Sequence, residues 1–345
     1  MKFSFAFILV PLFLLIQTYQ FSSASQDLLL ASAVRANKLA PALYVFGDSL
    51  VDSGNNNYLK TLAKVNYTPY GIDFPNGASG RFTNGYTTVD YLAAWLGLPF
   101  VPPFLGLSKV QKGKITTGIN YASGAAGILP ESGTATISTY MATSIFVVVI
   151  GNNDYINNYL QPTRYNSSKL YTPQQYAALL VSTLKQHLTS VYNLGARKFV
   201  VFELGPIGCL PSIVNSITPK PVTPCVEGVN SLIQIFNLGI TNMIQELTST
   251  LKGSTFVHGD IFEKVYQQDI NPLKYGFTGG NTPCCSISNA SSLCLPNQTP
   301  CKNRNVYLHW DGYHPTQRVN YEIANGCFRG LSTCFPINVH KLACL

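Results

Sequence analysis

The sequence predicts an α/β fold in which helices cover both faces of a parallel β-sheet. The run IFVVVI at 145–150 is apolar throughout, and the run KFVVF that begins at Lys198 is nearly so. Strands that are apolar on both faces belong to parallel sheets buried between helices. Patterns of helical period stand between these runs, so the connections are expected to be right-handed helical crossovers.

Five segments have strand character, at 42–46, 118–121, 145–150, 198–203 and 255–258. Three segments have the apolar spacing of helices, at 87–96, 173–194 and 226–251. Residues 271–306 lack periodicity and are rich in Gly, Pro and Cys, so we expect one long loop pinned by disulfides. No internal repeat interrupts this order, and residues 41–345 are expected to form a single domain.

The amino terminus has the layout of a secretory signal peptide. Lys2 precedes an apolar stretch at 3–16, and small residues follow at 22–25. The alternative is a membrane anchor, which is disfavoured because a span requires about 20 apolar residues. We therefore expect a signal peptide over 1–25, a leader segment over 26–40, and a secreted, extracellular protein with no transmembrane segment after cleavage.

Composition and charge narrow the range of partners. The chain has 23 Lys and Arg against 15 Asp and Glu, a formal charge of +8. It has no arginine-rich run and no basic stripe with interleaved aromatics, so a nucleic-acid partner is not expected. Weak association with acidic cell-wall polysaccharide fits the charge, and so does a merely solvated surface. Four glycosylation sequons suit a secreted glycoprotein: Asn66, Asn166, Asn289 and Asn297.

All nine cysteines lie after residue 200. In a secreted chain they predict disulfides, and the odd number leaves one cysteine outside an internal pair. Cys209 and Cys225 flank a proline-rich loop that a disulfide would close. A zinc site is not expected, because no Cys-x-x-Cys pair recurs at finger spacing. No metal or other cofactor is predicted.

Ser49 directly follows the first predicted strand, at the sheet edge where α/β folds bind ligands. A serine nucleophile needs a base, and the base needs an orienting partner. His314 stands out among five histidines because Asp311 precedes it by three residues and Pro315 follows it. On a tight turn, the Asp311 carboxylate can reach Nδ1 and fix the imidazole tautomer. The alternative is that Asp311 and Pro315 only cap the next helix.

Two further residues follow predicted strands and can supply N–H groups to an oxyanion. Gly124 lies in INYASGAAGI, after the second strand segment, and Asn153 lies in VVVIGNNDY, after the third. Glycine permits close backbone approach, and the asparagine amide can point at developing negative charge. Either sequence can also be an ordinary turn. Their common position at one sheet edge, together with Ser49, favours an acyl-transfer site.

Taken together, these blocks resemble the GDSL esterase/lipase family, also called SGNH hydrolases. The matching residues are GDSL at 47–50, the glycine of NYASG, the asparagine of GNND and DxxHP at 311–315. Longer strings resemble the plant secreted branch and occur in order over residues 41 to 330: FGDSLVDSGNNN, GRFTNGYTTVDYLA, NYASGAAGI, GNNDY, ELGPIGCLP and WDGYHPTQ.

The resemblance implies a three-layer α/β/α sandwich with a five-stranded parallel sheet, similar to flavodoxin. It also implies hydrolysis of carboxylic esters of lipids, acylated small molecules or polysaccharides, through a serine acyl-enzyme, in the apoplast or cell wall. Ser49 is then the nucleophile, His314 the general base and later acid, and Asp311 the group that orients His314. The oxyanion hole comprises the backbone N–H groups of Ser49 and Gly124 and the side-chain amide of Asn153.

The chain departs from the family pattern at two places. Gly312 is expected to add backbone freedom between the acid and the base. Ala125 stands where a second glycine is common and is expected to narrow that side of the pocket. Asp48 is expected to hold the turn around Ser49 through backbone hydrogen bonds. Trp310 is expected to line the pocket, because it adjoins Asp311.

Other functions remain compatible with the same scaffold. One is a catalytically silent binding glycoprotein associated with the cell wall or with defence. Another is an acyltransferase, because an acyl-enzyme can pass its acyl group to a hydroxyl other than water. A retaining glycosidase is disfavoured, since no acid pair apart from Asp48 and Asp52 lies at a strand end. Neither the acyl chain length nor the alcohol of the substrate follows from the sequence.

Overall fold

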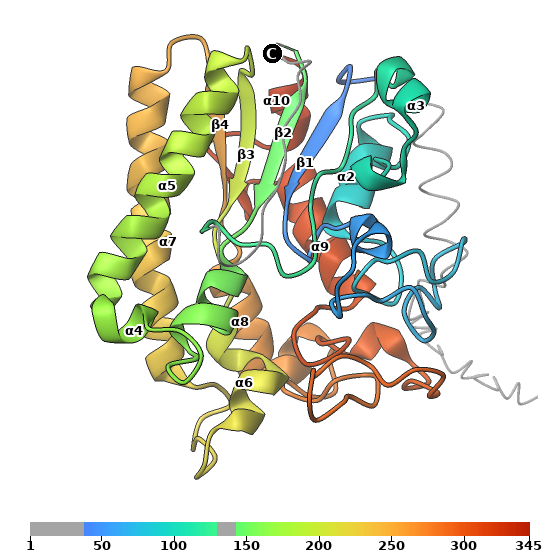
Figure 1. Ribbon diagram of the computed structural model, residues 1–345, viewed down its shortest axis with the longest axis vertical. Helices are drawn as coiled ribbons and strands as arrows, with labels where there is room; N and C mark the ends of the chain where they lie inside the picture. The colour runs from blue at the N-terminus through green and yellow to red at the C-terminus, as the bar shows by residue number, and fades with distance from the viewer. Residues whose placement is uncertain (1–37, 130–142) are drawn as a thin grey trace, which may run out of the picture.

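The computed structural model describes residues 38–129 and 143–345 (Figure 1). The expected signal peptide at 1–25 and all but the end of the leader lie outside the described residues. Within them, one sheet contains five strands in the order of their sequence. These are β1 (Leu43–Gly47), β2 (Ile145–Val149), β3 (Lys198–Phe202), β4 (Thr255–Gly259) and β5 (Cys334–Phe335).

The predicted α/β fold with a five-stranded sheet is confirmed, with two differences in the sheet. Strands β1 to β4 pair in parallel, but β5 runs antiparallel to β4. The segment expected as a second parallel strand, 118–121, makes only an isolated parallel bridge to β1, between Asn120 and Val45. Gly118 has a φ of 108°, which turns the backbone out of the extended conformation and interrupts the ladder.

That segment still lies along the outer edge of β1. The N–H of Val45 donates to Ile119 O at 3.2 Å, and the N–H of Tyr121 donates to Val45 O at 2.8 Å. The spatial order is therefore 118–121, β1, β2, β3, β4, which is the strand order of flavodoxin-like sheets. In such sheets ligands bind where the strand order reverses, which here falls between β1 and β2.

Helices cover both faces of the sheet and make three layers (Figure 1). Alternate strand residues point to opposite faces, so Tyr44 packs toward one layer and Val45 toward the other. One layer contains α5 (Pro173–Asn193) and α7 (Glu227–Thr250). The opposite layer contains α2 (Thr88–Trp95), α9 (Gln317–Phe328) and α10 (Val339–Ala343). The other α-helices of the described residues are α3 (Lys109–Lys114), α4 (Ser167–Leu170), α6 (Pro211–Ser216) and α8 (Phe262–Ile270), and a π-helix spans Asp154–Tyr159.

The three helices predicted from apolar spacing form within one or two residues of their expected bounds. The side chain of Thr172 caps α5 by accepting a hydrogen bond from the N–H of Gln175, and Pro173 occupies its first turn. Gly195, with a φ of 110°, follows the end of the same helix. None of the helices within 38–129 and 143–345 has the length and hydrophobicity of a membrane span.

Loops and short helices gather at the carboxyl ends of the strands, where α6, α8 and the loop before α9 lie below the sheet in Figure 1. The segment 271–306 is the expected loop, with short 3₁₀ turns at Pro272–Tyr275 and Arg304–Val306. Cys344 is exposed and stays outside the disulfides formed by the other eight cysteines. The pairs are Cys209–Cys225, Cys284–Cys301, Cys285–Cys294 and Cys327–Cys334.

Candidate active site

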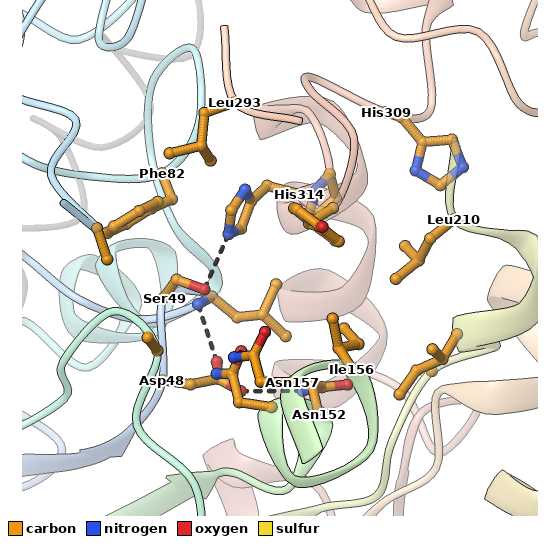
Figure 2. A pocket seen from close by; sticks show the side chains of 18 of the residues that line it. Asp48, Ser49, Phe82, Asn152, Ile156, Asn157, Leu210, Leu293, His309 and His314 are labelled. Carbon is orange, nitrogen blue, oxygen red and sulfur yellow. Dashed lines mark hydrogen bonds between the residues drawn. The ribbon is translucent and has the colours of Figure 1, made fainter. Parts of the chain in front are cut away.

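Ser49, His314 and Asp311 meet at the carboxyl edge of the sheet, although 265 positions separate the serine from the histidine (Figure 2). Ser49 Oγ lies 2.8 Å from His314 Nε2. Nδ1 of the same ring lies 2.8 Å from each carboxylate oxygen of Asp311. With Nδ1–H donating to Asp311, the neutral imidazole presents Nε2 as an acceptor for the serine proton.

The turn that carries Asp311 and His314 is held by its own hydrogen bonds. Asp311 Oδ1 accepts from the backbone N–H groups of Tyr313 at 2.8 Å and His314 at 2.9 Å. Gly312 is close-packed instead of adding the expected freedom: a Cβ there would lie 2.5 Å from Ser292 Cβ and 2.7 Å from Ser292 O. The N–H of Gly312 also donates to Ser292 O, which ties this turn to the disulfide-pinned loop.

Asp311 has a further partner that sequence reasoning missed. The Tyr70 hydroxyl donates to Asp311 Oδ2 at 2.6 Å and accepts from the backbone N–H of Cys294 at 3.1 Å. Burial and the Asp311 charge raise the pKa of Tyr70 well above its usual value, so its hydroxyl stays protonated and donates. These donors compensate for the burial of the Asp311 charge. Trp310 is fully buried, packs edge-on against Tyr70 and is absent from the cavity wall. The prediction that Trp310 lines the pocket was therefore wrong.

Gly124 does not offer the N–H group that was expected of it. Its backbone N–H donates to Asp52 Oδ2 at 3.1 Å. Asp52 also accepts from the N–H groups of Gly54 and Asn55, both at 2.7 Å, so its buried carboxylate clamps the loop after β1 to the loop after 118–121. The glycine is required for close approach, since a Cβ at 124 would lie 2.6 Å from both Asn56 Nδ2 and a Phe82 ring carbon.

The backbone N–H of the next residue, Ala125, is the one left without a hydrogen bond beside the cavity. The carbonyl of Gly124 accepts from Asn56 Nδ2 at 2.9 Å. The N–H of a trans peptide points opposite to its C=O, so the Ala125 N–H points away from Asn56. This N–H makes no hydrogen bond with any described residue, and Ala125 lines the cavity. Ala125 has a φ of 68°, a conformation that glycine adopts more readily, which explains why a second glycine suits this position.

Asn153 is oriented from two sides. One amide hydrogen of Nδ2 donates to Ala126 O at 2.9 Å, and its Oδ1 accepts from Asn157 Nδ2 at 3.0 Å. The second amide hydrogen makes no hydrogen bond with the described residues, and Asn153 is part of the cavity wall. Asn153 is also fixed through its neighbour: the Asp154 carboxylate accepts from the N–H groups of Ile128 and Leu129.

Asp48 holds the turn around Ser49, as expected. Its Oδ1 accepts from the N–H of Leu50 at 3.0 Å, and its Oδ2 accepts from Asn152 Nδ2 at 3.1 Å. Burial raises the pKa of Asp48 to about 6, although the hydrogen bonds and the nearby His314 oppose this shift. Burial likewise raises the pKa of Asp52 to about 6 against its backbone hydrogen bonds.

These two carboxyls predict a definite pH dependence of stability. Their folded-state pKa values lie above the ordinary 3.8, so between those values the folded state binds more protons than the unfolded state. Their contribution to stability is therefore complete below about pH 4 and is lost as the pH rises through about 6. We expect Asp48→Asn to raise the thermal unfolding midpoint at pH 7.5 relative to wild type, with a smaller gain at pH 4.5.

Asparagine suits this position because the Asn152 amide can rotate and accept from the new NH₂ group. Glu246→Gln, which alters an exposed carboxyl, is the matched control and should leave the pH profile unchanged. Differential scanning fluorimetry measures both. An equal shift of the Asp48→Asn midpoint at the two pH values would contradict the assignment.

Ser49, His314 and Asn153 open into one cavity of about 750 Å³. Polar side chains also line this cavity, including Asn152, Asn157 and Gln161. Apolar side chains from the segments after β2 and β3 and from around α8 and α9 form much of the rest: Ile156, Ile207, Leu210, Ile261, Val265, Leu308, Val319 and Ile323. Such a cavity can accept a small or chain-like apolar group beside Ser49.

Comparison with known proteins agrees with this geometry. A family model described as GDSL-like Lipase/Acylhydrolase matches residues 43–326. "GDSL esterase/lipase 7" of Arabidopsis thaliana is 42% identical over 338 residues, which cover 88% of this chain and 92% of that protein. "GDSL esterase/lipase At5g08460" of the same plant is 40% identical over 339 residues, covering 88% of this chain and 87% of that protein.

Among solved structures, an extracellular lipase from Streptomyces rimosus is similar over 85% of this chain and 97% of its own. The sequence identity is 15% and the TM-score is 0.39.

Proposed function

Because the chain belongs to the GDSL-like lipase/acylhydrolase family, we propose that it hydrolyses carboxylic esters through an acyl-enzyme formed on Ser49. The observation that supports this most is the pair of 2.8 Å contacts that His314 makes, with Ser49 Oγ on one side and Asp311 on the other. A serine within hydrogen-bond reach of an oriented imidazole is the arrangement of an activated nucleophile.

In the first half of the reaction, Ser49 Oγ attacks the ester carbonyl while its proton passes to His314 Nε2. Asp311 stabilises the imidazolium that forms, and Tyr70 keeps the carboxylate in place. His314 then returns the proton to the leaving alcohol, which leaves the acyl group on Ser49. In the second half, His314 takes a proton from water as the water oxygen attacks the acyl carbon. The bond between that carbon and Ser49 Oγ then breaks, His314 returns the proton to Ser49 Oγ, and the acid is released.

The negative charge on the carbonyl oxygen needs donors that are in place before the reaction. We assign this role to the N–H of Ser49, the side-chain amide of Asn153 and the N–H of Ala125. Ala125 replaces Gly124 in the expected set, since the Gly124 N–H is committed to Asp52. Asn56 then acts as a positioning residue, because its hydrogen bond to Gly124 O fixes the orientation of the peptide that carries the Ala125 N–H.

The proposed function is tested by covalent labelling. A fluorophosphonate probe should attach stoichiometrically to Ser49, as mass spectrometry of the proteolytic peptides can show, and should abolish hydrolysis of p-nitrophenyl esters. Hydrolysis that persists after complete labelling, or labelling at a different residue, would overturn the assignment. The same assay with added alcohol measures how much acyl group is transferred to hydroxyls other than water.

Asn153→Ala is expected to lower kcat by about 10²- to 10³-fold, with KM changed much less, because the amide acts on charge that develops in the transition state. Asn157→Ala is the matched control: it removes the bond that orients Asn153 and leaves the amide itself, so its effect should be smaller. Steady-state kinetics on one p-nitrophenyl ester decides the point. A change confined to KM would count against an oxyanion role.

Secretion is part of the proposal. The signal peptide over 1–25, the leader over 26–40 and the four disulfides are consistent with export to an oxidising compartment. All four sequon asparagines are exposed, as glycosylation requires: Asn66, Asn166, Asn289 and Asn297. Weak association with acidic cell-wall polysaccharide is the remaining expectation, which rests on the net positive charge alone.

A further inference from the structure

The cavity holds a second histidine–aspartate pair, which the proposed reaction does not use. His309 and Asp269 line the same cavity as Ser49. His309 Nε2 lies 2.8 Å from Asp269 Oδ1, and the two side chains are only 6% and 1% exposed. His309 stands on the loop that leads into Asp311, whereas Asp269 lies on α8. Figure 2 shows His309 beside Leu210 and across the view from Ser49.

The surroundings of this pair are apolar. Val265, one helical turn before Asp269, and Leu308, next to His309, both belong to the cavity wall. Placing an ionisable pair in such a wall costs free energy relative to apolar residues of similar volume. Apolar residues would be enough to pack this loop against α8, so packing alone does not explain the pair. Asp269 Oδ2 is moreover buried without a hydrogen-bond partner among the described residues.

The hydrogen bond to Asp269 determines what His309 offers to the cavity. With Nε2–H donating to Asp269, the neutral ring has Nδ1 as an acceptor. Nδ1 makes no hydrogen bond with the described residues, and it is not among the polar atoms that are buried without a partner. Since His309 belongs to the cavity wall, this unpaired Nδ1 can accept a hydrogen bond from a molecule bound there.

We propose that His309 and Asp269 form a second polar subsite, which accepts a hydrogen bond from a hydroxyl group on an otherwise apolar part of the ester substrate. This rests on the proposed function, since the same molecule must present its ester to Ser49 and its hydroxyl to His309. A hydroxyl on the acyl chain and a hydroxyl on the alcohol chain offer the same donor. The substrates of the test separate these two sources.

The test compares kcat/KM for matched esters with the full-length glycosylated protein. One series consists of p-nitrophenyl octanoates with a methylene, a hydroxyl or an oxo group at the same carbon, moved stepwise along the chain. The second series places the hydroxyl on the octyl group of octyl acetate. At one position in one series, the ester with the hydroxyl should have a kcat/KM about tenfold higher than the matched ester with a methylene. This factor is what one buried hydrogen bond contributes. The oxo group has no donor and should give no gain.

The double variant His309→Phe/Asp269→Leu fills the volume and leaves no lone buried charge, so it should fold and lose the hydroxyl preference, with a ratio near one. His187→Phe, the same change at an exposed position on α5, is the matched control and should keep the preference. If the double variant does not fold, His309→Met/Asp269→Leu, which also removes the Nδ1 acceptor and the buried carboxylate, should lose the hydroxyl preference in the same way.

The outcomes separate the two proposals. No hydroxyl preference in wild type, an equal preference for the oxo group, or a preference that survives in the variant would overturn the subsite and leave the esterase intact. Failure of wild type to hydrolyse any ester in either series would overturn the proposed function itself.

Discussion

Replacing Ser49 with alanine is expected to lower kcat for ester hydrolysis by about 10⁴- to 10⁶-fold. Alanine removes the only atom that the mechanism uses to attack the carbonyl, and His314 Nε2 then has no serine hydroxyl at 2.8 Å to deprotonate. KM should change little, because the Asn153 and Ala125 donors and the cavity wall remain. Hydrolysis of p-nitrophenyl esters, followed at high enzyme concentration, measures the residual rate.

Ser53→Ala is the matched control for this experiment. Ser53 lies four residues further along the same loop, and its Oγ is buried without a hydrogen-bond partner among the described residues. Removing that hydroxyl should leave both kcat and the thermal midpoint close to those of wild type. If Ser49→Ala were as active as wild type, or if both variants lost activity equally, the serine mechanism would fail.

Asp311→Asn is expected to lower kcat by about 10³- to 10⁴-fold while the fold persists. A neutral amide cannot stabilise the imidazolium of His314, and its NH₂ group competes with Nδ1–H for the same space. The amide oxygen of the new side chain can still accept from the N–H groups of Tyr313 and His314, so the turn should keep its shape. Steady-state kinetics should therefore show a large loss of kcat, whereas the thermal unfolding midpoint should fall only slightly.

Tyr70→Phe provides a graded comparison for Asp311. It removes one hydrogen bond to the carboxylate, leaves the negative charge in place and should lower kcat by about tenfold. A loss in Asp311→Asn no larger than that in Tyr70→Phe would mean that Asp311 only holds the turn. In that case the base function of His314 would not depend on the carboxylate.

The local pattern of apolar and capping residues was sufficient to predict most of the secondary structure. The run at 145–150 forms a strand because its side chains are buried on both faces, and α5 begins and ends at the capping residues that its sequence presents. Pattern failed where tertiary contacts decide the outcome. β5 has only two residues, too few for any period, and 118–121 has strand composition but is interrupted at Gly118.

The site divides in the same way. The residue types and the order of the motifs were sufficient to predict that Ser49, Asp311 and His314 act together, because a nucleophile, a base and an orienting acid are needed by the chemistry. Sequence could not decide which backbone amide is the one that we propose for the oxyanion. Gly124 and Ala125 are neighbours, and which N–H faces the cavity depends on hydrogen bonds with Asp52 and Asn56, which precede Gly124 by 72 and 68 residues.

Composition, hydrophobic period and motif order were enough to predict the layered fold and the kinds of side chain at the site. Which of these side chains meet could be read only from the folded chain: Tyr70 contacts Asp311, Asp52 contacts Gly124, and His309 contacts Asp269. The physical reason is that hydrogen bonds act over about 3 Å, whereas these partners are separated by tens to hundreds of residues along the chain.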